Sequence, residues 1–240
     1  MTMIGQNLQQ VQARIRAACD AAGRGCDAVT LLAVSKTFGP DALRAAHAAG
    51  QLAFGENYLQ EAVDKMAALR DLPLEWHCIG PIQSNKTRLV AEHFDWAHTV
   101  DRLKTAQRLS DQRPPEMAPL QVCLQVNIDG GANKAGVAPG EALALAQQIA
   151  TLPRIQLRGL MTIPEPAPDF DAALTVHRRA HNLLQQLRAA GLQLDTLSMG
   201  MTGDLEAAIH AGSTMVRVGT AIFGGRSYPA RDTATLDRPG

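Results

Sequence analysis

The chain has 240 residues, of which 46% are hydrophobic and 19% charged, and its 23 basic and 23 acidic side chains give a formal net charge of zero. A neutral chain lacks the basic surface that nucleic-acid binding requires, and no apolar stretch approaches the roughly 20 residues of a membrane span. The sequence therefore predicts a globular protein that takes a small molecule, with neither nucleic acid nor membrane as a partner.

The start of the chain has no basic region followed by an apolar block, so it carries no sign of a secretory signal, and we predict a cytoplasmic protein. The four cysteines are at positions 19, 26, 78 and 123, with neither a CxxC pair nor the spacing typical of a metal-binding motif. We expect them to be reduced and expect no metal site.

An amphipathic helix over residues 3–22 comes first, and apolar runs then alternate with helical patterns. Eight runs are predicted as strands: 29–35, 52–55, 74–80, 95–100, 120–127, 155–162, 194–199 and 214–218. Each strand except the last is followed by a predicted helix: 40–49, 59–69, 84–93, 102–110, 139–151, 170–190 and 203–211.

This alternation indicates the α/β class, with parallel strands and helical crossovers. Eight units without a linker predict one domain over residues 1–240, a (β/α)₈ TIM barrel with an extra N-terminal helix over about 1–25 and a frayed tail over about 229–240. A doubly wound open sheet would need fewer strands and a Gly-rich first turn. The first turn reads SKTFGP and contains no GxGxxG motif.

Lys36 ends the apolar run VTLLAVSK and, by strand alternation, shares a face with Thr30, Leu32 and Val34. This face would point the amine inward, over the mouth of the barrel. An amine that burial deprives of its proton is a nucleophile that can form a Schiff base. On position alone, a solvent-exposed lysine that caps the strand or pairs with a carboxylate remains an alternative.

The last two βα turns, SMGMTGDLEAAI and RVGTAIFG, combine small residues, hydroxyls and a helix start. In barrels, the loops after strands seven and eight frequently hold a phosphate group. The candidate phosphate contacts are Ser198, Thr202, Gly219 and Thr220. The alternative is ordinary capping, in which Thr202 caps its helix and the nearby Asp204 and Glu206 would repel a phosphate.

A Schiff-base lysine opposite a phosphate site points to pyridoxal 5′-phosphate as the cofactor. Arg217 shares a face with Gly219 and could approach the pyridine nitrogen, where a guanidinium would disfavour protonation of that nitrogen. It could equally form an ion pair at the barrel rim. Asn57 and His77 could reach toward the ring from strands two and three, although a lone histidine in an apolar strand is more often a hydrogen-bonded core residue.

The motifs LLAVSKT, FGENYLQEAVDK, LEWHCIGPIQSNK, LRGLMTIP, LSMGMTGDLEAAI and STMVRVGTAIFG closely resemble those of the pyridoxal phosphate homeostasis proteins, the YggS/PROSC family. The resemblance runs over about residues 8–228. It implies a barrel like the N-terminal domain of alanine racemase, with the cofactor as a Schiff base on Lys36. It also implies phosphate contacts from the RVGT segment and from SMGM, which includes Met201, and a pyridine-nitrogen contact from Arg217.

The resemblance further implies a role in intracellular supply of this vitamin B6 cofactor, as a carrier or buffer without an established catalytic turnover. Two positions depart from the family pattern. Phe38 stands where many members have a second lysine, and Thr202–Gly203 stand where many have Asp or Ser followed by Asp. A role for that second lysine in handing over the cofactor is therefore in doubt for this chain.

The sequence is compatible with three functions: a cofactor carrier, an amino-acid racemase and a scaffold that binds a protein partner without cofactor. Racemisation needs two bases on opposite faces of the substrate. In racemases that resemble this barrel the second base comes from a C-terminal domain, for which a chain ending at Gly240 leaves no room. We expect negligible racemase activity, no catalytic residues, a monomer, and cofactor-free pyridoxal-phosphate enzymes as acceptors.

Overall fold

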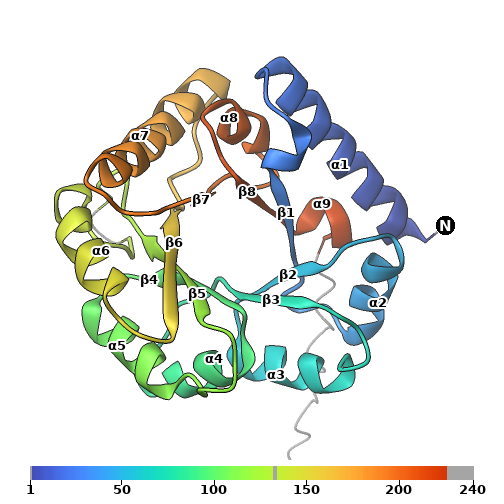
Figure 1. Cartoon of the computed structure of the whole chain (residues 1–240). Helices are drawn as coiled ribbons and strands as arrows, with labels where there is room; N and C mark the ends of the chain where they lie inside the picture. Colours follow the sequence, from blue (N-terminus) through green and yellow to red (C-terminus); the bar gives the residue numbers. More distant parts are fainter. Residues whose placement is uncertain (1, 132–133, 226–240) are drawn as a thin grey trace, which may run out of the picture.

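The computed structural model describes residues 2–131 and 134–225, and it forms a closed barrel of eight parallel strands in chain order with helices around the outside (Figure 1). The strands are β1 (Thr30–Val34), β2 (Ala53–Glu56), β3 (Glu75–Cys78), β4 (Trp96–Val100), β5 (Leu120–Gln125), β6 (Ile155–Met161), β7 (Thr196–Ser198) and β8 (Met215–Val218). The (β/α)₈ prediction is confirmed. The expected frayed tail lies outside the described residues.

The helices follow the predicted order: α1 (Met3–Ala21), α2 (Pro40–Ala48), α3 (Leu59–Ala68), α4 (Thr87–His93), α5 (Leu103–Gln112), α6 (Ala142–Ala150), α7 (Phe170–Ala189), α8 (Leu205–His210) and α9 (Thr220–Phe223). Two short 3₁₀ helices, η1 (Cys26–Ala28) and η2 (Pro139–Glu141), precede β1 and α6. Two expectations are wrong. Helix α4 begins at residue 87 rather than 84, because residues 84–86 form a turn, and the last strand is followed by a short helix, α9.

Helix α1 occupies a place in the outer ring between α8 and α2 (Figure 1). Its buried face carries Leu8, Val11 and Ile15 at helical spacing, and it packs against both α8 and α9. Because α9 has only four residues, it is too short to cover the gap between β8 and β1. The N-terminal helix therefore takes the position of the eighth outer helix.

Strand alternation separates two layers of the core. On β1, β2 and β8, outward residues such as Ala33, Phe54 and Val216 belong to the large cluster shared with the helices. The inward neighbours Leu32, Ala53 and Met215 form a separate small cluster with Ile79. The barrel interior also buries polar side chains, among them His77, His98, Ser198 and Arg217.

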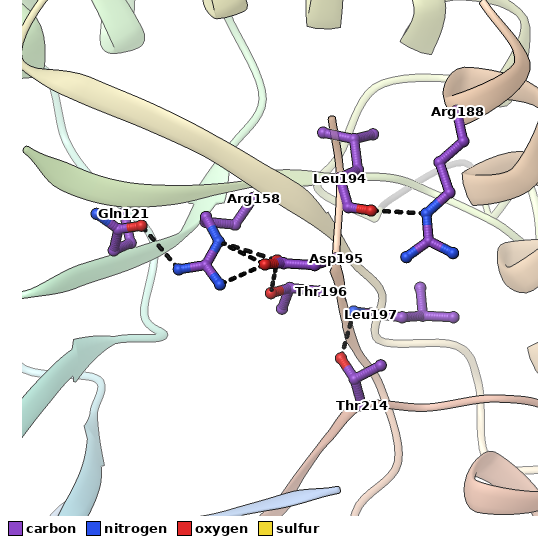
Figure 2. Close-up of polar contacts among 8 residues, drawn as sticks. All are labelled: Gln121, Arg158, Arg188, Leu194, Asp195, Thr196, Leu197 and Thr214. Carbon is purple, nitrogen blue, oxygen red and sulfur yellow. Dashed lines mark hydrogen bonds and ion pairs between the residues drawn. The ribbon is translucent and has the colours of Figure 1, made fainter. Parts of the chain in front are cut away.

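Near the amino end of the barrel, an ion pair and hydrogen bonds join β5, β6 and the start of β7 (Figure 2). Arg158 of β6 pairs with Asp195 at 2.5 Å, donates to Gln121 Oε1 at 2.9 Å, and lies 5.0 Å from the ring centroid of Trp96. In (β/α)₈ barrels this end serves stability, whereas ligands bind at the carboxyl end. Within the part of the chain that is described, no helix combines the length and the apolar character that crossing a membrane requires.

Candidate functional site

A cavity of about 410 Å³ lies at the carboxyl ends of the strands. Its size falls within the range of roughly 300–1,000 Å³ that is usual for small-molecule sites. The lining residues are Val34, Lys36, Asn57, Ile79, Ile163, Met201, Thr202, Gly203, Arg217, Gly219 and Thr220. Two larger cavities, of about 550 and 520 Å³, contain neither Lys36 nor Arg217.

Lys36 lies in the turn directly after β1 and is partly buried. Val34, two residues earlier, lines the same cavity, so the inward face that strand alternation predicts continues to Lys36. The cavity also contacts Thr202 and Thr220, which belong to the turns after β7 and β8. The structure thus brings Lys36 and the two closing turns together around one space.

The residue before Lys36 is held by a buried ion pair that the sequence did not reveal. Nζ of Lys65 donates to the backbone oxygen of Ser35 at 2.8 Å and to Oε1 of Glu56 at 2.8 Å. The hydroxyl of Ser35 donates to the same carboxylate oxygen at 2.6 Å. Burial raises the pKa of Glu56, and the positive charge of Lys65 opposes that shift.

The residue after Lys36 is held by Glu61. Its Oε1 accepts the backbone N–H of Thr37 at 2.6 Å and also contacts Nζ of Lys65 at 2.5 Å. Thr37 has φ of +70°, a left-handed conformation that is costly for a β-branched residue. We call Ser35, Glu56, Glu61 and Lys65 the Lys65 cluster, and it fixes the backbone on both sides of Lys36.

Arg217 extends from β8 toward the floor of the cavity and is 4% exposed. Nη1 donates to Ser198 Oγ at 2.8 Å and Nη2 to the backbone oxygen of Thr162 at 2.9 Å. Burial lowers the pKa of Arg217 to about 10, which leaves it charged at neutral pH. Among the described residues it forms no ion pair, so the rim ion pair weighed from the sequence is not present.

The acids near the closing turns are directed away from the cavity. Asp204, at the N-cap position of α8, accepts the Met201 N–H at 2.6 Å and lies 2.9 Å from Nε2 of the buried His177. Glu206 pairs with Arg14 of α1 at 2.8 Å. Each carboxylate contacts a partner outside the cavity lining and neither acid lines the cavity, so the repulsion of a phosphate considered above is reduced. Thr202 does not cap α8.

Two glycines permit close approaches beside the cavity. A Cβ on Gly219 would lie 3.1 Å from the backbone oxygen of Val34, so the end of β8 could not pack as closely against β1 with a larger residue. A Cβ on Gly80 would lie 2.2 Å from the backbone oxygen of Asn57. Gly80 therefore allows the turn that carries Asn57 to sit against the end of β3.

Of the nine predicted site residues, seven line the cavity: Lys36, Asn57, Met201, Thr202, Arg217, Gly219 and Thr220. The other two lie beneath it. Ser198 is fully buried and contacts Arg217, and His77 is fully buried and contacts His98 rather than the cavity. His77 thus occupies the hydrogen-bonded core position that was the alternative interpretation.

Two further lysines differ in their surroundings. Lys86 is exposed. Lys134 lies 3.2 Å from both Asp129 and Glu165 and donates to the backbone oxygen of Ile163 at 2.9 Å. Its side chain is only 20% exposed, so its amine is engaged by these protein groups rather than left in bulk solvent.

Residues 6–227 match the family model described as the alanine racemase N-terminal domain. The pyridoxal phosphate homeostasis protein of Pseudomonas aeruginosa is 59% identical over 230 residues, which cover 96% of this chain and 99% of that relative. The chain belongs to the family of the pyridoxal phosphate homeostasis proteins. The resemblance found in the sequence motifs is thereby confirmed.

Other members of the family agree. The pyridoxal phosphate homeostasis protein of Escherichia coli K12 is 52% identical over 231 residues, covering 95% of this chain and 99% of the relative. The solved structure of PipY from Synechococcus elongatus PCC7942 with PLP bound is 37% identical, with a TM-score of 0.81 and coverage of 92% of this chain and 100% of that one. The relatives are named for homeostasis of the cofactor rather than for a catalysed reaction.

The barrel is also shared with enzymes outside the homeostasis family. Alanine racemase of Clostridium difficile 630 has a TM-score of 0.72 at 16% identity, over 95% of this chain and 58% of the racemase. At this identity the likeness concerns the fold alone. What the site does must therefore be argued from its own residues.

Proposed function

We propose that this chain binds pyridoxal 5′-phosphate covalently through Lys36 and carries or buffers it inside the cell. One observation carries the proposal: a partly buried lysine, fixed on both sides by the Lys65 cluster, lines the same cavity as a buried guanidinium that forms no ion pair with any described residue. A buried cation that lacks an ion pair favours a ligand with anionic or acceptor groups. The cofactor named in the homeostasis relatives has both.

The residues around the cavity fit this group. When bound, the cofactor supplies an aldehyde that reacts reversibly with an amine. We assign the amine to Lys36 and a hydrogen bond toward the ring nitrogen to Arg217. Asn57 adds a polar contact, because its Oδ1 is buried and has no hydrogen-bond partner among the described residues.

We assign the phosphate to the closing turns, residues 201–203 after β7 and 219–220 after β8. Backbone N–H groups in the first turn of a helix lack intrahelical acceptors, and α9 begins at Thr220. The hydroxyls of Thr202 and Thr220 add two further donors beside the cavity. The contacts of Asp204 with His177 and of Glu206 with Arg14 support this assignment, since both partners lie outside the cavity lining and neither carboxylate lines the cavity.

We further propose that the chain is not a racemase. Racemisation requires a second base facing the first across the substrate. Among the described residues that line the cavity, Lys36 and Arg217 are the only ionisable ones, and an arginine stays protonated at neutral pH. No observation favours a different reaction. The acceptor enzymes, the monomeric state and the cytoplasmic location stay predictions.

The function is tested by binding and transfer measured on the same preparation. The chain is loaded with pyridoxal 5′-phosphate, dialysed, and mixed with a cofactor-free pyridoxal-phosphate enzyme, whose recovered activity is followed. We expect stoichiometric retention of cofactor and recovery of the acceptor's activity. Absence of binding would contradict the proposal, and so would turnover of D- or L-alanine at ordinary enzyme rates of about 1–10³ s⁻¹.

A further inference from the structure

A continuous series of polar contacts crosses the barrel interior from Arg217 to Glu75 at the amino end. Nη1 of Arg217 donates to Ser198 Oγ, and Nδ1 of His98 lies 3.0 Å from that oxygen. Nε2 of His98 lies 2.9 Å from Nδ1 of His77, and Nε2 of His77 lies 2.9 Å from Oε1 of Glu75. We call Glu75, His77, His98 and Ser198 the interior network.

The inner members of this network are sealed from water. His77, His98 and Ser198 are fully buried, whereas the side chain of Glu75 is 48% exposed. His77 stacks on Trp96, with ring centroids 5.3 Å apart and planes 9° from parallel. Because water cannot reach the buried groups, each proton between two of them must have a protein acceptor.

The arginine end determines the direction of the first bond. A guanidinium only donates, so Ser198 Oγ accepts from Arg217. The Ser198 hydroxyl proton must then point to its other neighbour, Nδ1 of His98, which acts as an acceptor. A proton on that Nδ1 would leave two donors facing one oxygen and the buried hydroxyl proton without an acceptor.

The remaining bonds follow from the tautomer of His98. A neutral imidazole with an accepting Nδ1 carries its proton on Nε2, and this proton is donated to Nδ1 of His77. His77 in turn carries its proton on Nε2, which lies 2.9 Å from the carboxylate of Glu75 in an electrostatic contact whose angle falls short of a hydrogen bond. The reverse direction would require a protonated Glu75, but the contact with His77 keeps the pKa of Glu75 below its usual value.

Burial also favours neutral imidazoles in both rings. Burial lowers the pKa of His77, although Glu75 and Asp95 oppose the shift. Burial lowers the pKa of His98 well below its usual value, and His77 and Arg217 add to that effect. At the amino end, the charge of Arg158 helps to lower the pKa of Glu75.

We propose that Glu75, His77 and His98 are positioning residues that act through Ser198 to hold the Arg217 guanidinium at the cavity, with both imidazoles neutral and protonated on Nε2. This role deepens the proposed function and rests on it only for the identity of the ligand. The network fixes a lone pair of Ser198 toward Arg217. Ser198 and the Thr162 oxygen accept two of the five N–H groups of the guanidinium, and we assign to a ligand the other three, which have no acceptor among the described residues.

The tautomers are tested without ligand by ¹H–¹⁵N correlation of protein labelled in its histidine rings. We expect one-bond N–H couplings at Nε2, and none at Nδ1, for both His77 and His98 at pH 7.5. A proton on Nδ1 of either ring, or an imidazolium at that pH, would overturn the proposal. Since no cofactor is present, this outcome is independent of whether the chain binds pyridoxal 5′-phosphate.

The positioning role is tested with His98→Leu, which removes the acceptor of the Ser198 proton. We expect greater motion of the Arg217 Nε–H in ¹⁵N relaxation of the ligand-free protein, and an affinity for pyridoxal 5′-phosphate lower by about three- to tenfold, the effect of about one hydrogen bond. The matched control is His93→Leu on α4, outside the network, which should change neither quantity. Unchanged Arg217 motion in a folded His98→Leu variant would overturn the positioning role of the interior network. If that variant does not fold, the tautomers of His77 and His98 in the wild-type protein test the proposal instead.

Discussion

The ammonium group of Lys65 lies 2.8 Å from the backbone oxygen of Ser35, the residue that precedes Lys36 in the chain. Lys65 is 4% exposed, so this contact and the ion pair with Glu56 are made away from water. A helix that follows β2 thus determines the backbone at the end of β1. Rigid support of this kind is what a site needs if it is to hold one reactive amine in a fixed place.

Lys65→Met should destabilise the protein and disturb the site. Removing one partner of a buried ion pair leaves the other charge uncompensated, which costs about 3–5 kcal/mol. We expect a loss of this order in the free energy of unfolding by urea, together with weaker cofactor retention. The matched control is Lys104→Met on the exposed face of α5, which should change stability by less than about 0.5 kcal/mol.

A second variant separates the unpaired charge from the lost packing. Glu56→Gln added to Lys65→Met removes the negative charge that the first substitution strands, so stability should recover in part. If Lys65→Met costs no more than Lys104→Met, the Lys65 cluster does not support the turn as described.

Arg217→Lys should weaken cofactor binding although the charge is retained. A lysine has a single ammonium group and cannot bond Ser198 Oγ and the Thr162 oxygen while it also faces the cavity. We expect an affinity loss of about 10- to 100-fold, which corresponds to about 1.4–2.8 kcal/mol. Equilibrium dialysis with pyridoxal 5′-phosphate measures it. Arg102→Lys, whose side chain is exposed, is the control, and equal affinities of the two variants would argue against the assigned role.

Acid should weaken the fold partly through Asp204. Burial opposes the shift, but the hydrogen bonds from His177 and from the Met201 N–H lower the pKa of Asp204 below its usual value. The unfolded-state pKa of an aspartate is about 3.9, so below that pH the unfolded chain binds more protons at residue 204 than the folded chain does. The stabilisation of the fold by ionised Asp204 is therefore present above that pH and is lost as the pH falls. We expect the difference in free energy of unfolding by urea between wild type and Asp204→Asn to become smaller as the pH falls from 6 to 2.5. A difference that stays constant over this range would contradict this account.

The four cysteines should differ sharply in reactivity. Cys19, Cys78 and Cys123 are fully buried, and burial raises the pKa of Cys78 and Cys123 to about 12, whereas Cys26 is exposed. A thiol reagent at pH 8 should modify one cysteine in the folded protein and four after unfolding. Cys26→Ser should abolish the fast reaction, and rapid modification of a second thiol would show that the packing of the barrel differs from that described.

Strand alternation was sufficient to predict the direction of the side chains on β1 and β8. It correctly placed Lys36 and Arg217 on inward faces, because neighbouring residues of a strand point to opposite sides whatever the tertiary context. The same rule could have placed His98 on the inward face of β4, because it lies two residues after the inward Trp96. Its link to His77 depends on which strands adjoin, and that emerges only once the barrel closes.

The Lys65 cluster could not be predicted in this way. Glu61 and Lys65 stand four residues apart on a helix, a spacing that usually indicates a solvated surface pair. The burial of this pair depends on how α3 packs against the turn after β1, and a local sequence pattern does not contain that information. Helix α9 was missed for a different reason, since four residues are too few to show a helical period.

The most direct test of the central claim is chemical mapping of the cofactor on the unmodified chain. The protein is loaded with one equivalent of pyridoxal 5′-phosphate, reduced with borohydride to make the link permanent, digested and analysed by mass spectrometry. We predict that the label is found on Lys36, one of five lysines at positions 36, 65, 86, 104 and 134. A label mainly on Lys86, Lys104 or Lys134, or no label above background, would contradict the account.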